Sequence, residues 1–148
     1  MAVRPARPSD LEPLVAATLG MAKDSEGLVL DPEEARRGVA AVLKDSGKGA
    51  FFVLEEGGRV VASLFVTFEW SDWHDAWYWW LQSVHVVPGR RGEGLFRRLY
   101  EGVREAARRQ GDVRSVRLYV EGHNEAGLRA YRGLGMKETE YRVFDHPL

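Results

Sequence analysis

The residues with the clearest chemical meaning form a short turn, Arg91-Gly92-Glu93-Gly94-Leu95-Phe96. Gly92 and Gly94 have no side chains, so a ligand can approach the backbone closely there. An apolar run precedes the turn and an amphipathic pattern follows it, which predicts strand, turn and helix. The N-terminus of a helix has free N–H groups that attract anions, and Arg91 adds positive charge. The sequence therefore predicts a ligand that carries phosphate.

Two flanking elements must position this turn. The strand before it is expected over residues 76–87 and ends at Pro88, which has no N–H for a sheet ladder. The helix after it is expected to begin between Gly92 and Leu95, with an apolar face spaced as Leu95, Leu99 and Val103.

The turn fits neither of two common nucleotide motifs. It lacks the Gly-Lys-Ser/Thr of a P-loop and the complete three-glycine dinucleotide fingerprint. It instead resembles the acyl-CoA turn of the GCN5-related N-acetyltransferases, whose pattern is Gln/Arg-x-x-Gly-x-Gly/Ala. Arg91 and Gly94 match, and Phe96 stands where glycine or alanine is usual. Because Phe96 keeps its backbone N–H, we expect its side chain to point away from the ligand.

A second block downstream resembles the same family. Asn124-Glu125-Ala126 and, further on, Tyr131 to Met136 resemble its Asn-x-x-Ala…Tyr-x-x-x-Gly-Phe block, with Met136 in place of Phe. Asn124 and Tyr131 are separated by about two helical turns, so both side chains lie on one face of a helix.

Composition limits the alternatives. The chain has 148 residues, 45% of them hydrophobic, which predicts one domain with a substantial core. The formal net charge is −1, which argues against a nucleic-acid partner. Cysteine is absent, which suits a reducing cytoplasm. The sequence contains no apolar run of membrane-spanning length and no signal-peptide pattern, so we expect a cytoplasmic protein without membrane attachment.

The whole chain reads as an α/β fold, a mixed sheet with helices on both faces. The predicted order is β, α, α, β, β, β, α, β, α, β, which is also the core order of the family. The resemblance therefore covers residues 1–148 as a single domain. It implies the acyl-CoA N-acyltransferase fold, a three-layer αβα arrangement around a mostly antiparallel sheet of six to seven strands. The predicted elements span residues 2–6, 10–22, 31–45, 50–55, 60–70, 76–87, 95–110, 115–120, 125–134 and 136–144.

The resemblance also implies a cosubstrate, acetyl-CoA, and no metal. Backbone N–H groups of residues 92–97 would bind the pyrophosphate, and the strand around Val84–Val86 would pair with the pantetheine arm. Arg90, Arg91 and Arg97 are expected near the CoA phosphates. The residues expected to bind the cosubstrate are Val84, His85, Val86, Arg91, Gly92, Glu93, Gly94, Leu95, Phe96, Arg97 and Asn124.

Acetyl transfer to an amine needs an acid for the leaving thiolate and a base for the ammonium. The resemblance implies that Tyr131 is the acid. Glu69, at the end of the preceding strand, is the first candidate for the base. Further candidates remain open; they are Asp72, His74, Asp75, His85, Glu121 and His123.

An aromatic and acidic loop is a candidate acceptor site. Trp70 and Trp73, with Glu69, Asp72 and Asp75, could attract an ammonium through cation–π contacts and charge. Core packing explains most of the other aromatic residues nearby.

The sequence thus predicts an acetyl-CoA-dependent N-acetyltransferase, an acyltransferase that acts on a primary amine of a small molecule or peptide. By resemblance, the amine attacks directly in a ternary complex. The alternatives are a non-catalytic acyl-CoA-binding or regulatory module on the same fold and, third, a nucleic-acid-associated domain. A monomer and a homodimer are equally compatible with the sequence.

Overall fold

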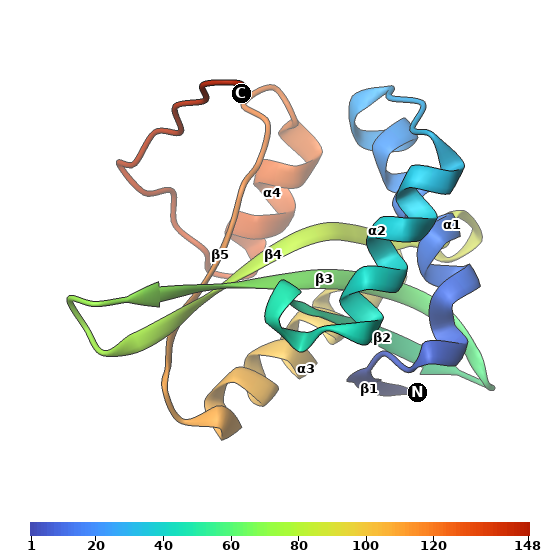
Figure 1. Cartoon of the computed structure of the whole chain (residues 1–148), viewed down its shortest axis with the longest axis horizontal. Helices are drawn as coiled ribbons and strands as arrows, with labels where there is room; N and C mark the ends of the chain where they lie inside the picture. The colour runs from blue at the N-terminus through green and yellow to red at the C-terminus, as the bar shows by residue number, and fades with distance from the viewer.

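The computed structural model describes all 148 residues and contains one five-stranded sheet with the order β1-β2-β3-β4-β5 (Figure 1). The strands are β1 (Ala2–Pro5), β2 (Ala50–Glu56), β3 (Arg59–Ser71), β4 (Ala76–Val86) and β5 (Val113–Leu118). The helices are α1 (Leu11–Glu26), α2 (Pro32–Lys44), α3 (Leu95–Gln110) and α4 (Glu125–Gly133), with short 3-10 turns η1 (Pro8–Asp10), η2 (Ser46–Lys48) and η3 (Pro88–Arg90). Strands β1 to β4 pair antiparallel, and β5 pairs parallel to β4. The predicted mixed, mostly antiparallel sheet is confirmed. No helix combines the length and the apolar character that a membrane span requires.

Helices pack on both faces of the sheet. Adjacent residues of a strand point to opposite faces, and in β2 both Val53 and Leu54 are fully buried. Val53 packs with Leu14 of α1 and Val39 of α2. Leu54 packs with Leu99 of α3. The α1–α2 pair and α3 therefore cover opposite faces, as the sequence predicts.

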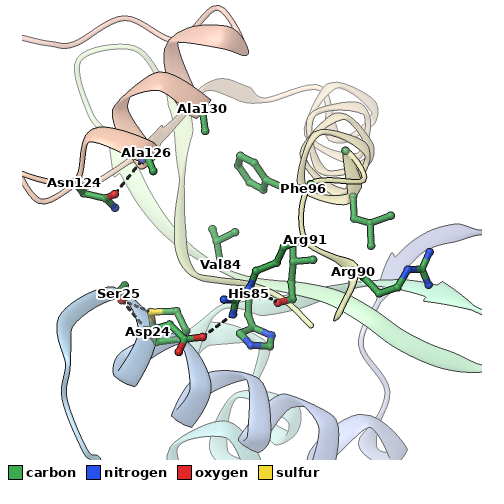
Figure 2. A pocket seen from close by; sticks show the side chains of 16 residues that line it. Asp24, Ser25, Val84, His85, Arg90, Arg91, Phe96, Asn124, Ala126 and Ala130 are labelled. Carbon is green, nitrogen blue, oxygen red and sulfur yellow. Dashed lines mark hydrogen bonds and ion pairs between the residues drawn. The ribbon is translucent and has the colours of Figure 1, made fainter. Parts of the chain in front are cut away.

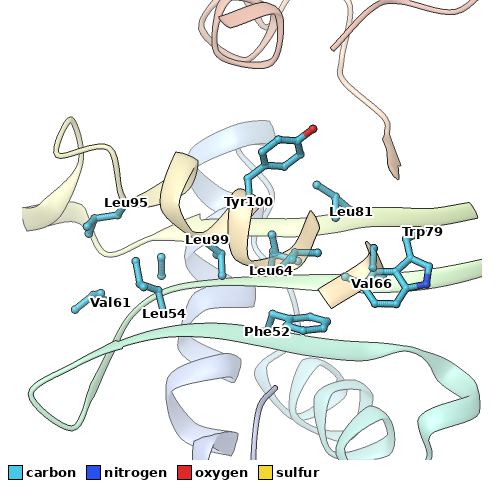
Figure 3. Close-up of a cluster of buried hydrophobic side chains, with 13 residues drawn as sticks. Phe52, Leu54, Val61, Leu64, Val66, Trp79, Leu81, Leu95, Leu99 and Tyr100 are labelled. Atoms are coloured by element: carbon cyan, nitrogen blue, oxygen red, sulfur yellow. The ribbon is translucent and has the colours of Figure 1, made fainter. Parts of the chain in front are cut away.

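The larger core lies between α3 and the sheet (Figure 3). Leu95, Leu99 and Val103 recur at helical spacing and are buried against strand residues such as Leu64 and Val66. This amphipathic face fixes the position of α3, and with it the position of the turn that precedes the helix.

The predicted last strand, Met136–Phe144, is absent, so the expectation of six to seven strands is wrong. Charged and apolar residues alternate from Glu140 to Val143, a short pattern that is typical of a strand. However, Tyr141 is 77% exposed and Val143 is 72% exposed, so the apolar side has no core to pack against. A strand is stabilised by its neighbours and by burial rather than by its own pattern, and this segment has neither. Figure 1 shows it, in red, as an irregular tail.

Helix α1 is longer than predicted. It ends at Glu26, and Gly27 closes it in a left-handed conformation with φ 65°. The sequence predicts that this helix ends near Ala22 and that Asp24 lies in a loop. Asp24 instead lies in the last turn of α1.

Candidate active site

The predicted glycine turn has the backbone that an anion site needs. Gly92 and Gly94 have left-handed φ values of 85° and 75°, which favour glycine. Gly94 is the N-cap of α3, and no side chain caps this end of the helix. The first N–H groups of α3 therefore remain free for a ligand.

One edge of β4 is open beside the turn. The ladder between β4 and β5 ends at the pair Leu81–Leu118, whereas β4 continues to Val86. Across from β3, the residues between Gln82 and His85 form a bulge, and Ser83 there has a φ of 45°. A β-bulge bends a strand and disrupts its ladder. Backbone groups of β4 past Leu81 are therefore available to an extended ligand.

A pocket of about 440 Å³ connects this edge to the turn (Figure 2). Its walls come from the end of α1, the end of β4, the turn with the start of α3, and the first turns of α4. Nine of the eleven residues expected to bind the cosubstrate line it. They are Val84, His85, Val86, Arg91, Gly92, Gly94, Leu95, Phe96 and Asn124. Glu93 and Arg97, the other two, do not line it, nor do Tyr131 and Glu69.

Arg91 joins the turn to α1 across the pocket. Its guanidinium donates to Asp24 Oδ2 at 2.5 Å and to the carbonyl oxygen of Val86 at 3.2 Å. The hydrogen bond from Arg91 holds the pKa of Asp24 below its ordinary value. Figure 2 shows the pair as a bridge between the two elements. An anion bound at the turn must share Arg91 with Asp24.

The other arginines expected at the phosphates have partners within the protein. Arg90 lines the pocket and also bonds Glu93 Oε2 at 2.7 Å and Glu56 Oε2 at 2.5 Å. Arg97 donates to the carbonyl oxygen of Gly133 at 2.9 Å, at the end of α4. Arg97 thus ties α3 to α4.

Phe96 lies on the pocket wall and contacts the predicted acid. The rings of Phe96 and Tyr131 meet edge to face with centroids 5.9 Å apart. Figure 2 shows the Phe96 ring in the space between α3 and α4. The expectation that this side chain points away from the ligand is therefore wrong, because Phe96 lines the pocket. Burial raises the pKa of the Tyr131 phenol. The phenol therefore keeps its proton at neutral pH and can donate it.

Asn124 caps α4. Its Oδ1 accepts a hydrogen bond from the N–H of Gly127 at 3.0 Å. The side-chain amide N–H groups of Asn124 donate to no acceptor within the protein, and the residue lines the pocket.

His85 is a half-buried imidazole at the pocket. It lies against α1, where a Cβ added at Gly20 would come within 3.1 Å of its Nε2 atom. Burial lowers the pKa of His85, the positive charge of Arg91 lowers it further, and Asp24 opposes both. His85 is therefore neutral at pH 7 and able to accept a proton.

The predicted acceptor site of aromatic and acidic loop residues is not assembled around Glu69. In β3, Glu69 pairs with Tyr78 and Trp70 pairs with Trp77, so Glu69 and Trp70 point to opposite faces. Trp70 packs edge to face on Trp77 with centroids 4.9 Å apart, and Trp73 is 83% exposed.

Helix α1 contributes Met21, Asp24 and Ser25 to the pocket, a contribution that the sequence does not predict. Gly27 could have predicted where α1 ends, because a glycine just after a helix often marks its end. An end at Gly27 places Asp24 within the predicted helix. The contact of Asp24 with Arg91 spans 67 positions, however, and no local sequence pattern predicts it.

The family is established by comparison. The model of the acetyltransferase (GNAT) family matches residues 32–136, more than half of the chain. The chain therefore belongs to the GNAT acetyltransferase family, whose members transfer acetyl groups from acetyl-CoA. A search of curated proteins finds no match.

Solved structures agree with this assignment. The crystal structure of a possible acetyltransferase from Clostridium difficile 630 is 33% identical, with a TM-score of 0.95 over 99% of this chain and 97% of that one. A ribosomal-protein-alanine N-acetyltransferase from Brucella melitensis biovar Abortus 2308 is 11% identical, with a TM-score of 0.80 over 99% and 98% of the two chains. An aminoglycoside N-acetyltransferase in complex with CoA is 17% identical, with a TM-score of 0.77 over 99% and 93%. The last two similarities concern the fold.

Proposed function

We propose that residues 1–148 act as one N-acetyltransferase domain. It moves an acetyl group from acetyl-CoA to a primary amine of a small molecule or peptide. One observation carries this proposal: a single pocket joins the open edge of β4 to the uncapped N-terminus of α3. An extended arm that ends in a pyrophosphate needs both features in that order.

The turn would hold the pyrophosphate through the first N–H groups of α3 and through Arg91. The pantetheine arm would pair with the open edge of β4 near Val84 and Val86, because its amides can continue the interrupted ladder. The thioester would then lie at the bulge around Ser83, on the side of Tyr131.

The chemistry is a direct attack. A neutral amine nitrogen bonds to the thioester carbonyl carbon, the carbon–sulfur bond breaks, and the electron pair leaves with sulfur. Tyr131 gives its phenolic proton to the departing thiolate. The chain has no cysteine to carry the acetyl group, which agrees with a ternary complex.

Of the seven candidates for the base that accepts the ammonium proton, only His85 lines the pocket, and Glu69 is the first candidate from the sequence. Glu69 is half-exposed, lies outside the pocket and has Arg117 at 3.9 Å, so it would act through water. His85 lines the pocket and is neutral at pH 7. These positions favour His85 and keep Glu69 as the alternative.

A non-catalytic acyl-CoA-binding module on the same fold is the second candidate function. The position of Phe96 supports it, because the aromatic ring lines the pocket close to Tyr131.

Thiol release with acetyl-CoA and a panel of primary amines distinguishes the two functions. An N-acetyltransferase releases CoA only when an accepted amine is present, and mass spectrometry finds the amine heavier by one acetyl group. Tight CoA binding without release over the whole panel would select the binding module.

A further inference from the structure

One face of β4 and β5 carries an aromatic and charged cluster outside the pocket. Val116 and Leu118 of β5 pack toward α3, so Arg117 and Tyr119 point to the other face. Tyr78 and Trp80 of β4 share that face, since Trp77 and Trp79 pack toward α3. The resulting set, Tyr78, Trp80, Arg117 and Tyr119, is called the Arg117 cluster below.

Arg117 is held by aromatic rings rather than by hydrogen bonds. Its guanidinium carbon lies 3.6 Å from the ring centroid of Tyr78 and 5.8 Å from that of Trp80. On the side of the tail, the ring centroid of Tyr141 is 6.0 Å away. The side chain is only 26% exposed. Stacking covers the flat face of a guanidinium and leaves the N–H groups at its edge available.

Those N–H groups have no acceptor in the protein. Arg117 makes no hydrogen bond, and its one carboxylate neighbour, Glu69, is 3.9 Å away. A largely covered cation with unused donors is costly unless an anion satisfies it. Glu69 is half-exposed and can turn to solvent, so it need not block such an anion.

The cluster also provides an apolar wall that leads toward the bulge. Trp80 stacks on Tyr119 with centroids 4.4 Å apart and an interplanar angle of 17°. Gln82, next on the same face, donates to Thr67 at 3.3 Å. Ser83 of the bulge lies three residues beyond Trp80, about 10 Å along a strand.

We propose that the Arg117 cluster binds a carboxylate of the acceptor, so that the acceptor is an amine with a carboxylate roughly 10 Å away along an apolar chain. This inference rests on the proposed function, which puts the reacting amine at the bulge. One guanidinium fork matches one carboxylate in charge and in bidentate geometry. The substrate class is therefore long amino acids or the C-terminal end of short peptides.

The test uses glycine, γ-aminobutyrate and ε-aminocaproate, each beside its primary amide. In the parent enzyme, kcat/KM for ε-aminocaproate should exceed that for its amide by at least about tenfold, since hydrogen bonds to charged groups are worth that much. Glycine should show no such preference, because its carboxylate cannot reach Arg117. Equal rates for ε-aminocaproate and its amide in the parent would overturn the inference.

Variants assign the effect to Arg117. Arg117→Gln should abolish the preference for the acid over the amide. Arg117→Lys should keep the charge and only part of the preference, because it lacks the fork. Arg114→Gln, on the same strand but exposed, should keep the full preference. A preference that persists in Arg117→Gln would overturn the inference.

Failure of the proposed function is distinguishable from failure of this inference. If no amine releases thiol, calorimetric titration of the CoA-saturated parent with ε-aminocaproate and its amide still gives an answer. Tighter binding of the acid, lost in Arg117→Gln, supports the carboxylate site, and equal or absent binding of both contradicts it.

Discussion

The hydroxyl of Tyr131 distinguishes an acetyltransferase from a module that only binds acyl-CoA. Tyr131→Phe keeps the ring that packs on Phe96 and removes only the hydroxyl. A positioned acid contributes about 10²–10⁴-fold to a rate, so turnover should fall by at least about tenfold. CoA affinity and melting temperature should stay close to those of the parent. Steady-state thiol release and calorimetry measure these quantities.

Tyr100→Phe is the matched control for Tyr131. Tyr100 also packs against the Phe96 ring, at a centroid distance of 6.1 Å, but its side chain is buried in the core between α3 and the sheet. Its variant should keep full turnover. Equal turnover in Tyr131→Phe and the parent, where chemistry limits the rate, would make Tyr131 a packing residue.

The base is identified by its pH dependence. When pH falls through the pKa of the base, the base is protonated and the rate falls. The pKa of His85 is below its ordinary value of about 6.5, so a His85 limb in kcat/KM lies below that pH. His85→Gln should then lower the rate and remove this limb, while Glu69→Gln keeps it. The reverse pattern would make Glu69 the base.

For single residues, the sequence predicts the position of those that act through their own backbone or through a local motif. Gly92 and Gly94 have the left-handed conformations that the turn requires. Asn124 caps α4, the helix that the sequence predicts over residues 125–134. By contrast, Arg97 was expected at the phosphates, and its bond to Gly133 depends on how α3 meets α4. The charge pattern of one helix contains no such information.

At the scale of elements, α3 meets β1 at a glycine. A Cβ added at Gly102 would lie 2.6 Å from Val3 Cβ, and Val3 is β-branched and stiff. Overpacking of this kind costs about 1–3 kcal/mol. Gly102→Ala should therefore lower the free energy of unfolding, even though alanine favours a helix by roughly 1 kcal/mol.

Gly38→Ala in α2 is the control for helix propensity. A Cβ there would meet nothing within 4 Å, so the variant should gain roughly 0.5–1 kcal/mol in the free energy of unfolding. Denaturant unfolding of both variants measures the difference. A stabilised Gly102→Ala would show that β1 moves away from α3 without cost.

The prediction of elements is wrong where the stability of an element depends on its neighbours. Amphipathic α3 and the strands β2 to β4 follow their patterns, because those patterns report the faces they bury. The tail after Met136 alternates only from Glu140 to Val143 and forms no strand, since Tyr141 and Val143 stay largely exposed. Periodicity predicts a face to be buried, but it does not say what buries it.

At the scale of the whole molecule, the pocket draws on α1, β4, the turn with α3, and α4. A ligand bound there links all four and binds only the folded state. CoA at about 100 times its dissociation constant should add about 2.7 kcal/mol to the free energy of unfolding. The melting temperature should rise with CoA concentration. An unchanged melting temperature at millimolar CoA would argue against a CoA site.

A CoA site at the turn is tested most directly by the affinity of CoA, measured by calorimetry in three proteins. Arg91→Glu reverses the one arginine that bridges the pocket, and it should weaken CoA binding by at least about tenfold. Arg108→Glu makes the same change in charge at an exposed position of α3, far along the helix, and should bind CoA like the parent. Equal affinities in all three proteins, or equal losses in both variants, would contradict a CoA site at this turn.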